Sequence, residues 1–209
     1  MSKFMQKSMR QILDLAASAA PTPGGGSVAA MVACLGLSMA AMVGNLTLGK
    51  KNYLAVQAEV EDIITSVGDL SSQSELLLQE DMDVFARYIA ALSLPKNTPE
   101  EQNFRSGVME ENLRIATETP LNIARVCAEG LDLTLRITTI GNKSALSDAG
   151  VAALTLEAAL NGALLNVEAN AKIIKDQNYA AKAKEESKSL QTRATAAKVK
   201  ILEVMRARM

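Results

Sequence analysis

An unbroken apolar segment near the start of the chain, residues 27–44 (SVAAMVACLGLSMAAMVG), constrains the fold most strongly. A helix that is apolar around its whole circumference must be covered on all sides, so this segment predicts a buried helix in a bundle or at a subunit interface. Its length approaches that of a membrane span, but it is rich in Ala, Gly and Ser and lacks flanking aromatic residues. We expect no second segment of this kind, and therefore no membrane association.

The remaining sequence is also predicted to be helical. Helical periodicity marks residues 4–19, 53–93, 149–174 and the charged segment from about residue 179 onward. Thr98-Pro99 and Thr119-Pro120 each pair an N-cap residue with a proline at the first helical position, which predicts two separate helices after residue 98. The sequence thus predicts an all-α fold, with residues 1–209 as a single bundle of about six to seven helices. Two nearly all-apolar helices exceed what one small bundle hides, which also favours a homo-oligomer with an extensive helical interface.

The composition excludes several kinds of chemistry. The 22 basic and 23 acidic residues nearly balance and form no block of one sign, which argues against nucleic-acid binding. The chain has no histidine. This excludes a histidine-activated nucleophile and a histidine-ligated metal, so we expect no metal site and assign acid–base work to other groups. Cys34 and Cys127 lie in apolar stretches and are expected to be buried, reduced thiols. Together with the lack of a signal-peptide pattern, this favours the cytoplasm.

Two motifs flank the apolar segment. Gly24, Gly25, Gly26 and Ser27 stand where its helix is expected to begin, and unshielded backbone amides at the positive end of a helix suit an anion. The alternative is a flexible turn with Ser27 as the N-cap. Lys50, beyond the other end, either binds a polycarboxylate or simply stabilises the C-terminal end of the helix.

Polar residues within the other apolar patterns are candidates for chemistry. Asp81 lies close to the apolar side of its helix, where burial would raise its pKa and suit it to proton transfer, although helical acids more often form a solvated stripe. Asn166 and Asn170 are one turn apart on an apolar helix, so they either bridge helices or bind a ligand. Asn142 and Asp148, near the start of that helix, favour a ligand.

These motifs together resemble a known enzyme family. The strings that carry the likeness are PGGGSVAA (23–30), TLGKK (47–51), Asp81-x3-Phe85, LPKNTPEE (94–101), Gly141-Asn142, Ser147-Asp148 and Asn166-x3-Asn170. Their order and spacing resemble the cyclodeaminase domain of formiminotransferase-cyclodeaminase and the related stand-alone methenyltetrahydrofolate cyclohydrolases, over roughly residues 8–190. The formiminotransferase half is missing. The resemblance implies an all-helical, dimeric enzyme that acts on tetrahydrofolate derivatives, which can be polyglutamylated, and needs no other cofactor.

The resemblance also implies roles for the candidate residues. Asp81 is similar to the family's catalytic acid, which protonates departing ammonia or manages the proton of water. The substrate-binding residues implied are Asn142, Asp148, Asn166 and Asn170 for the pterin, and Gly24, Gly25, Gly26, Ser27 and Lys50 for the anionic part of the folate, such as its glutamate tail.

Two reactions fit this resemblance. The LPKNTPEE string is close to the bifunctional enzyme and favours cyclodeamination of 5-formiminotetrahydrofolate, as in histidine degradation, with a separate formiminotransferase supplying the substrate. The alternatives are hydrolysis of 5,10-methenyltetrahydrofolate to the 10-formyl compound, which a stand-alone chain favours, and a helical scaffold without catalysis.

Overall fold

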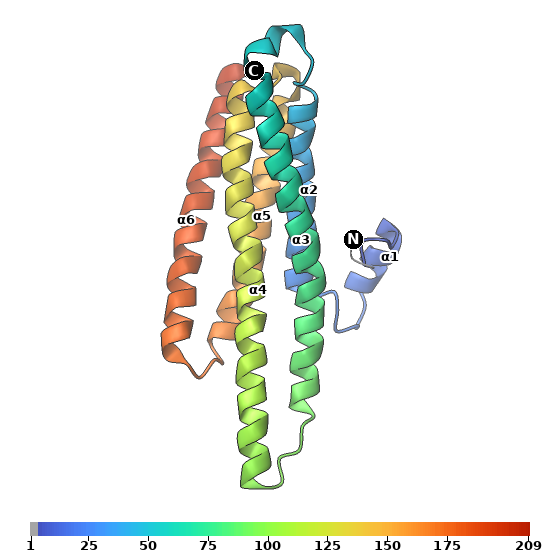
Figure 1. Ribbon diagram of the computed structural model, residues 1–209, viewed down its shortest axis with the longest axis vertical. Coiled ribbons are helices and arrows are strands. Elements are labelled where there is room, and N and C mark those ends of the chain that lie inside the picture. Colours follow the sequence, from blue (N-terminus) through green and yellow to red (C-terminus); the bar gives the residue numbers. More distant parts are fainter. Residues whose placement is uncertain (1–3) are drawn as a thin grey trace.

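Five long helices lie alongside one another, and a short helix, α1, lies to one side of them (Figure 1). The computed structural model describes residues 4–209, and this part of the chain contains no strand. The helices are α1 (Met9–Ala16), α2 (Gly25–Asn45), α3 (Gln57–Leu92), α4 (Pro99–Ile140), α5 (Leu146–Ala171) and α6 (Gln177–Arg208), with short 3-10 helices η1 (Lys51–Val56) and η2 (Lys143–Ala145). The predicted all-α bundle of about six to seven helices is confirmed.

The two most apolar helices, α2 and α5, form the centre of the bundle. They pack against each other, and both contact α4. Close approach depends on small residues: a Cβ atom at Gly36 would lie 2.8 Å from Cγ of Leu156. The two predicted buried thiols are confirmed, since Cys34 and Cys127 are both buried and unpaired. Burial raises the pKa of the Cys34 thiol to about 11.

Two helical segments, not one, are long and apolar enough to cross a membrane by length and composition alone. They are Gly25–Asn45 and Lys143–Ala171, so the expectation of a single such segment is wrong. Their most apolar windows are 56% and 44% buried within the bundle, respectively. Packing against neighbouring helices accounts for much of their apolar character, as in the core helices of other bundles.

Helix α4 runs unbroken through Pro120, so the prediction of two separate helices is wrong. A proline lacks the N–H that would bond to the carbonyl four residues earlier, here that of Ala116. Asn170 of α5 supplies the missing donor, because its Nδ2 donates to the Ala116 carbonyl at 2.7 Å. Thr119 does not cap a helix; its hydroxyl donates to the Ile115 carbonyl within α4. The prediction that a helix begins at Thr98-Pro99 is confirmed, since Thr98 and Glu101 form a capping box at the start of α4.

The arrangement of the helix ends determines where a site can form. Helices α3 and α4 form a hairpin that extends beyond the start of α2 (Figure 1). Because α2 and α5 are antiparallel, the glycine-rich start of α2 lies beside the C-terminal half of α5, and the end of α2 lies beside η2. Motifs far apart in the sequence therefore meet at two different places along the bundle.

Candidate active site

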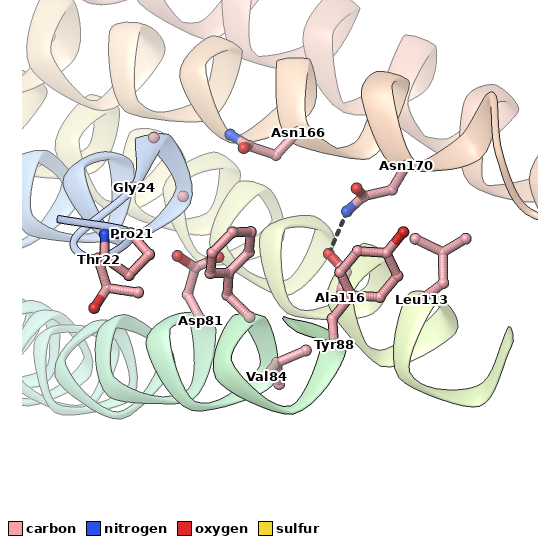
Figure 2. A pocket seen from close by; sticks show the side chains of 13 residues that line it. Pro21, Thr22, Gly24, Asp81, Val84, Tyr88, Leu113, Ala116, Asn166 and Asn170 are labelled. Atoms are coloured by element: carbon pink, nitrogen blue, oxygen red, sulfur yellow. Dashed lines mark hydrogen bonds between the residues drawn. The ribbon is translucent and has the colours of Figure 1, made fainter. Parts of the chain in front are cut away.

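A cavity of about 260 Å³ lies between the start of α2, the second half of α3, the middle of α4 and the end of α5 (Figure 2). It is lined by Pro21, Thr22, Gly24, Gly25, Gly26, Asp81, Val84, Phe85, Tyr88, Leu113, Ala116, Asn166 and Asn170. Figure 2 shows Asp81 on one wall and the two asparagines on the wall facing it. Among the described residues that line the cavity, Asp81 is the only Asp, Glu, Lys or Arg.

Asp81 contacts the glycine-rich start of α2. Its Oδ2 accepts a hydrogen bond of 2.6 Å from the hydroxyl of Ser27, which is fully buried. A Cβ atom at Gly26 would lie 2.2 Å from Oδ1 of Asp81, so only glycine leaves room for the carboxylate there. Burial raises the pKa of Asp81, and hydrogen bonding from the hydroxyl and backbone of Ser27 lowers it in part. The net increase makes the protonated carboxyl available at higher pH than for an ordinary aspartate.

The facing asparagines each use their NH₂ group on a helix carbonyl. Nδ2 of Asn166 donates to the Gly162 carbonyl at 3.0 Å, and Nδ2 of Asn170 donates to Ala116 (Figure 2). Neither Oδ1 atom receives a hydrogen bond from another residue in the described part of the chain. Oδ1 of Asn166 lies beside Gly25 at the edge of the cavity. Both oxygens are therefore available to accept hydrogen bonds from a ligand that has N–H groups.

Three of the predicted site residues lie elsewhere. Lys50 and Asn142 line a different cavity at the far end of the bundle, together with Lys51, Tyr53 and Lys143. Nδ2 of Asn142 donates to the Leu46 carbonyl at 2.8 Å and thereby joins the end of α2 to η2. A single site containing these residues and Asp81 is not formed within one chain.

Asp148 belongs to the same far end, in the first turn of α5. A helix rises about 1.5 Å per residue, so Asp148 lies roughly 27 Å along α5 from Asn166. A sequence motif indicates which residues belong together but not the end of a bundle at which they lie. Gly24, Gly25, Gly26, Ser27, Asp81, Asn166 and Asn170, in contrast, are all brought to the Asp81 cavity.

Comparison with known proteins identifies the family. A family model described as formiminotransferase-cyclodeaminase matches residues 8–189, which include both ends of the bundle. The chain belongs to the formiminotransferase-cyclodeaminase family.

Individual members of the formiminotransferase-cyclodeaminase family show how far the likeness extends. A methenyltetrahydrofolate cyclohydrolase from Methylorubrum extorquens is 37% identical over 202 residues, 97% of each chain. A formimidoyltransferase-cyclodeaminase from Rattus norvegicus is 35% identical over 90% of this chain, which spans only 35% of that relative. The crystal structure of a formiminotetrahydrofolate cyclodeaminase from Thermotoga maritima superposes with a TM-score of 0.88 at 25% identity, covering 97% of this chain and 98% of that one.

Part of the wall of the Asp81 cavity was not predicted from the sequence. Phe85 was noted as part of a motif, but Tyr88, Leu113 and Ala116 were not. Tyr88 follows Asp81 at a spacing of two helical turns, and the chain has only 3 Tyr and 3 Phe. An aromatic residue on the same face as a candidate acid was therefore a usable signal. Leu113 and Ala116 carried none, because only tertiary packing brings α4 to this cavity.

The contact between Asn170 and Ala116 can be tested through stability. Asn170→Ala is expected to lower the free energy of unfolding by about 1–3 kcal/mol, because the Ala116 carbonyl is left without a donor. Pro120→Ala supplies a backbone N–H for this carbonyl, so the same asparagine substitution should cost less in that background. Urea unfolding of the wild type, both single variants and the double variant measures the coupling. Strictly additive effects would contradict the role assigned to Asn170.

Proposed function

We propose that this protein converts 5-formiminotetrahydrofolate to 5,10-methenyltetrahydrofolate with release of ammonia, in the cavity beside Asp81. The observation that carries the proposal is the partly buried carboxyl of Asp81, which has a raised pKa in a cavity otherwise lined by apolar and neutral polar groups. The protein described as a cyclodeaminase in Thermotoga maritima has the same fold over nearly its whole length, which supports this reaction.

The reaction needs only positioning and proton transfer. N10 of the folate attacks the formimino carbon, the imine nitrogen takes a proton from the Asp81 carboxyl, and the resulting carboxylate takes the proton of N10. The Asp81 carboxyl then protonates the amino group, the C–N bond breaks, and ammonia leaves as the lone pair of N5 forms the methenyl cation. One proton is consumed overall, and no cofactor beyond the folate takes part. The Oδ1 atoms of Asn166 and Asn170 are suited to accept hydrogen bonds from pterin N–H groups.

The direction of the pKa shift gives a pH dependence. Because the protonated Asp81 carboxyl releases ammonia, kcat is expected to fall as pH rises through its raised pKa. The raised pKa should place this fall at a higher pH than an ordinary aspartate would. Initial rates at saturating substrate over a range of pH measure the profile. A kcat that rises throughout the same range would contradict an acid role for Asp81.

The Methylorubrum extorquens relative favours a second candidate, hydrolysis of 5,10-methenyltetrahydrofolate to 10-formyltetrahydrofolate. In that reaction Asp81 would act as a carboxylate that takes a proton from the attacking water, so the dependence on pH would be opposite. Incubating the purified protein separately with each folate and following the methenyl absorbance distinguishes the two. A signal that grows from the formimino substrate, with ammonia, supports the deaminase. Loss of signal from the methenyl substrate above the rate in buffer, with none gained from the formimino substrate, supports the hydrolase. No change beyond the buffer rate in either assay supports a scaffold.

We also propose that the protein is a homodimer that associates through α2. Three of its exposed residues, Val28, Leu35 and Met42, recur at intervals of seven, and their exposed fractions are 37%, 51% and 43%. Val32, Met39 and Leu46 repeat the interval on the same side, which is the pattern of a helix that packs against a partner helix. Burying this stripe would remove an exposed apolar surface that a monomer would have to keep in water.

A charge on this stripe tests the dimer. Leu35→Glu is expected to give a monomer, because a carboxylate would be buried without a partner at the interface. Leu76→Glu is the matched control, since Leu76 is 67% exposed on α3 and lies outside the stripe. Sedimentation velocity of the wild type and the two variants gives the oligomeric state. A wild-type monomer, or a Leu35 variant that remains dimeric, would contradict the proposal.

The proposed substrate places the protein after a formiminotransferase. That enzyme must attach the formimino group to tetrahydrofolate, and we propose that a separate cytoplasmic formiminotransferase does so during histidine degradation. Polyglutamylated folates fit the same proposal, because the reacting atoms lie at the opposite end of the folate from the glutamate chain.

A further inference from the structure

A second cavity, of about 330 Å³, adjoins the Asp81 cavity on the side toward the tip of the α3–α4 hairpin. The two cavities share Tyr88 and Leu113 in their walls. The other walls of the second cavity include Met109 and Ile173, which are apolar, and Arg105 and Lys175, which are cationic. A ligand that occupies the Asp81 cavity can therefore continue past Tyr88 toward two positive charges.

Arg105 is held in place by one hydrogen bond, and one of its N–H groups, which is buried, has no acceptor in the described part of the chain. Its Nη2 donates to the Leu92 carbonyl at the end of α3 at 3.2 Å, which fixes the guanidinium group against the hairpin. Its Nε is buried and has no hydrogen-bond partner among the described residues. A buried N–H without an acceptor is costly, and a guanidinium group is well suited to bind a carboxylate with two N–H groups. This arrangement indicates an acceptor on a ligand.

The other charges around the second cavity do not neutralise Arg105. The one acidic residue in its wall, Glu110, uses its carboxylate oxygens to accept hydrogen bonds from the backbone N–H groups of Lys175 and Asp176, at 3.1 Å. Lys175 contributes a second positive charge, and its Nζ donates to the Ser106 hydroxyl. The wall thus holds two cations and one anion, which favours binding of an anionic group.

We infer that the second cavity binds the p-aminobenzoylglutamate arm of the tetrahydrofolate, with the aromatic ring against Tyr88 and Leu113 and the glutamate carboxylates at Arg105 and Lys175. The inference rests on the proposed function, because it names where the rest of that substrate lies. At about 1.5 Å of rise per residue, Tyr88 lies roughly 10 Å beyond Asp81 along α3. Leu92, whose carbonyl accepts the hydrogen bond from Arg105, lies roughly 16 Å beyond Asp81. This matches a benzoyl ring followed by one extended amino acid.

This assignment replaces the expectation that the glycine-rich turn and Lys50 hold the anionic arm. The glycine-rich turn lies against the Asp81 carboxylate, which would repel a second anion. Lys50 lies at the far end of the bundle, in a cavity that shares no residue with the Asp81 cavity. The second cavity, in contrast, continues directly from the place where the one-carbon unit would react.

The test compares a folate with its pteroate counterpart, which lacks only the glutamate. The wild-type protein should turn over the folate form and the pteroate form of its substrate, whether that substrate carries the methenyl or the formimino group. The KM for the pteroate form should be about tenfold or more above that for the folate form. Arg105→Gln should raise the KM for the folate by a similar factor, change kcat much less, and bring the ratio of the two KM values close to one. Lys175→Gln should reduce the same ratio, and it provides the test if the Arg105 variant does not fold. Arg206→Gln, an exposed arginine near the end of α6, should leave the ratio as in the wild type.

The outcomes separate the inference from the proposed function. If the wild type turns over the folate but neither variant alters the ratio, the glutamate is bound elsewhere and the inference is wrong. Equal KM values for folate and pteroate in the wild type would also overturn it. If the wild type turns over no folate or pteroate substrate, the proposed function itself fails, and the subsite fails with it.

Discussion

The Asp81→Asn variant is expected to fold normally and to lose activity by a factor of about 10²–10⁴ in kcat. An amide of the same size keeps the place beside Ser27 and Gly26, but it cannot donate a proton to the departing ammonia. The KM for the folate should change much less, because the apolar walls and the asparagines are unaltered. Steady-state kinetics on purified protein measure both. A variant that retains near-normal kcat would remove Asp81 from the mechanism.

The same variant has a predicted effect on stability, and its sign follows from the pKa. Burial raises the pKa of Asp81 in the folded protein above its unfolded value. The stabilising contribution of this group is therefore fully present below the unfolded pKa. It is lost as pH rises from the unfolded pKa through the higher folded pKa, because a partly buried carboxylate is disfavoured. Asp81→Asn removes this dependence. We expect the variant to match the wild type in stability at acid pH and to be more stable near neutral pH. Urea unfolding at the two pH values measures the free energy of unfolding of both proteins. A difference between variant and wild type that is the same at both pH values would contradict the raised pKa.

Replacing Gly26 by alanine is expected to be the most damaging change that leaves the chemical groups intact. The added Cβ would lie 2.2 Å from Oδ1 of Asp81 and 2.7 Å from its Cγ, so either the carboxylate or the start of α2 must move. Overpacking of this kind typically costs about 1–3 kcal/mol in stability. A displacement of about 1 Å at a reacting group can cost about a hundredfold in rate. Thermal unfolding and kcat together measure the two effects.

Gly68→Ala is the matched control for Gly26→Ala. Gly68 is exposed within α3, and a Cβ atom there would have nothing within 4 Å. Alanine favours the helix by up to about 1 kcal/mol relative to glycine, so this variant should be slightly more stable and fully active. If Gly26→Ala behaved like Gly68→Ala, the close approach of α2 to Asp81 would not matter for function.

The fold was largely predictable because helix formation here depends on local patterns. The apolar segment at residues 27–44 became the central helix α2, and the Thr98 capping box marks the start of α4 as predicted. Pro120 was misread because Asn170 donates the missing hydrogen bond to the Ala116 carbonyl, and these two residues are 54 positions apart in the sequence. No local signal reports that compensation, since it arises only when α4 and α5 pack together.

The sequence indicated several residues that line the Asp81 cavity, but not which of the candidate residues lie far from it. Asp81 and the asparagines were recognised because polar residues within apolar helical patterns need a reason to be there. Lys50 and Asn142 were grouped with them through family resemblance, whereas the antiparallel packing of α2 and α5 places them at the opposite end. Arg105 gave no signal in the sequence because it lies in a charged stretch, and only the structure shows that its Nε is buried.

The most direct test is a crystal structure of the protein with 5-formyltetrahydrofolate, a stable analogue that carries a one-carbon group on N5. We expect this carbon within about 3.5 Å of the Asp81 carboxylate, the pterin facing Asn166 and Asn170, and the glutamate at Arg105. Density for the ligand at the Lys50 and Lys143 end of the bundle, with the cavity beside Asp81 empty, would contradict the proposed site.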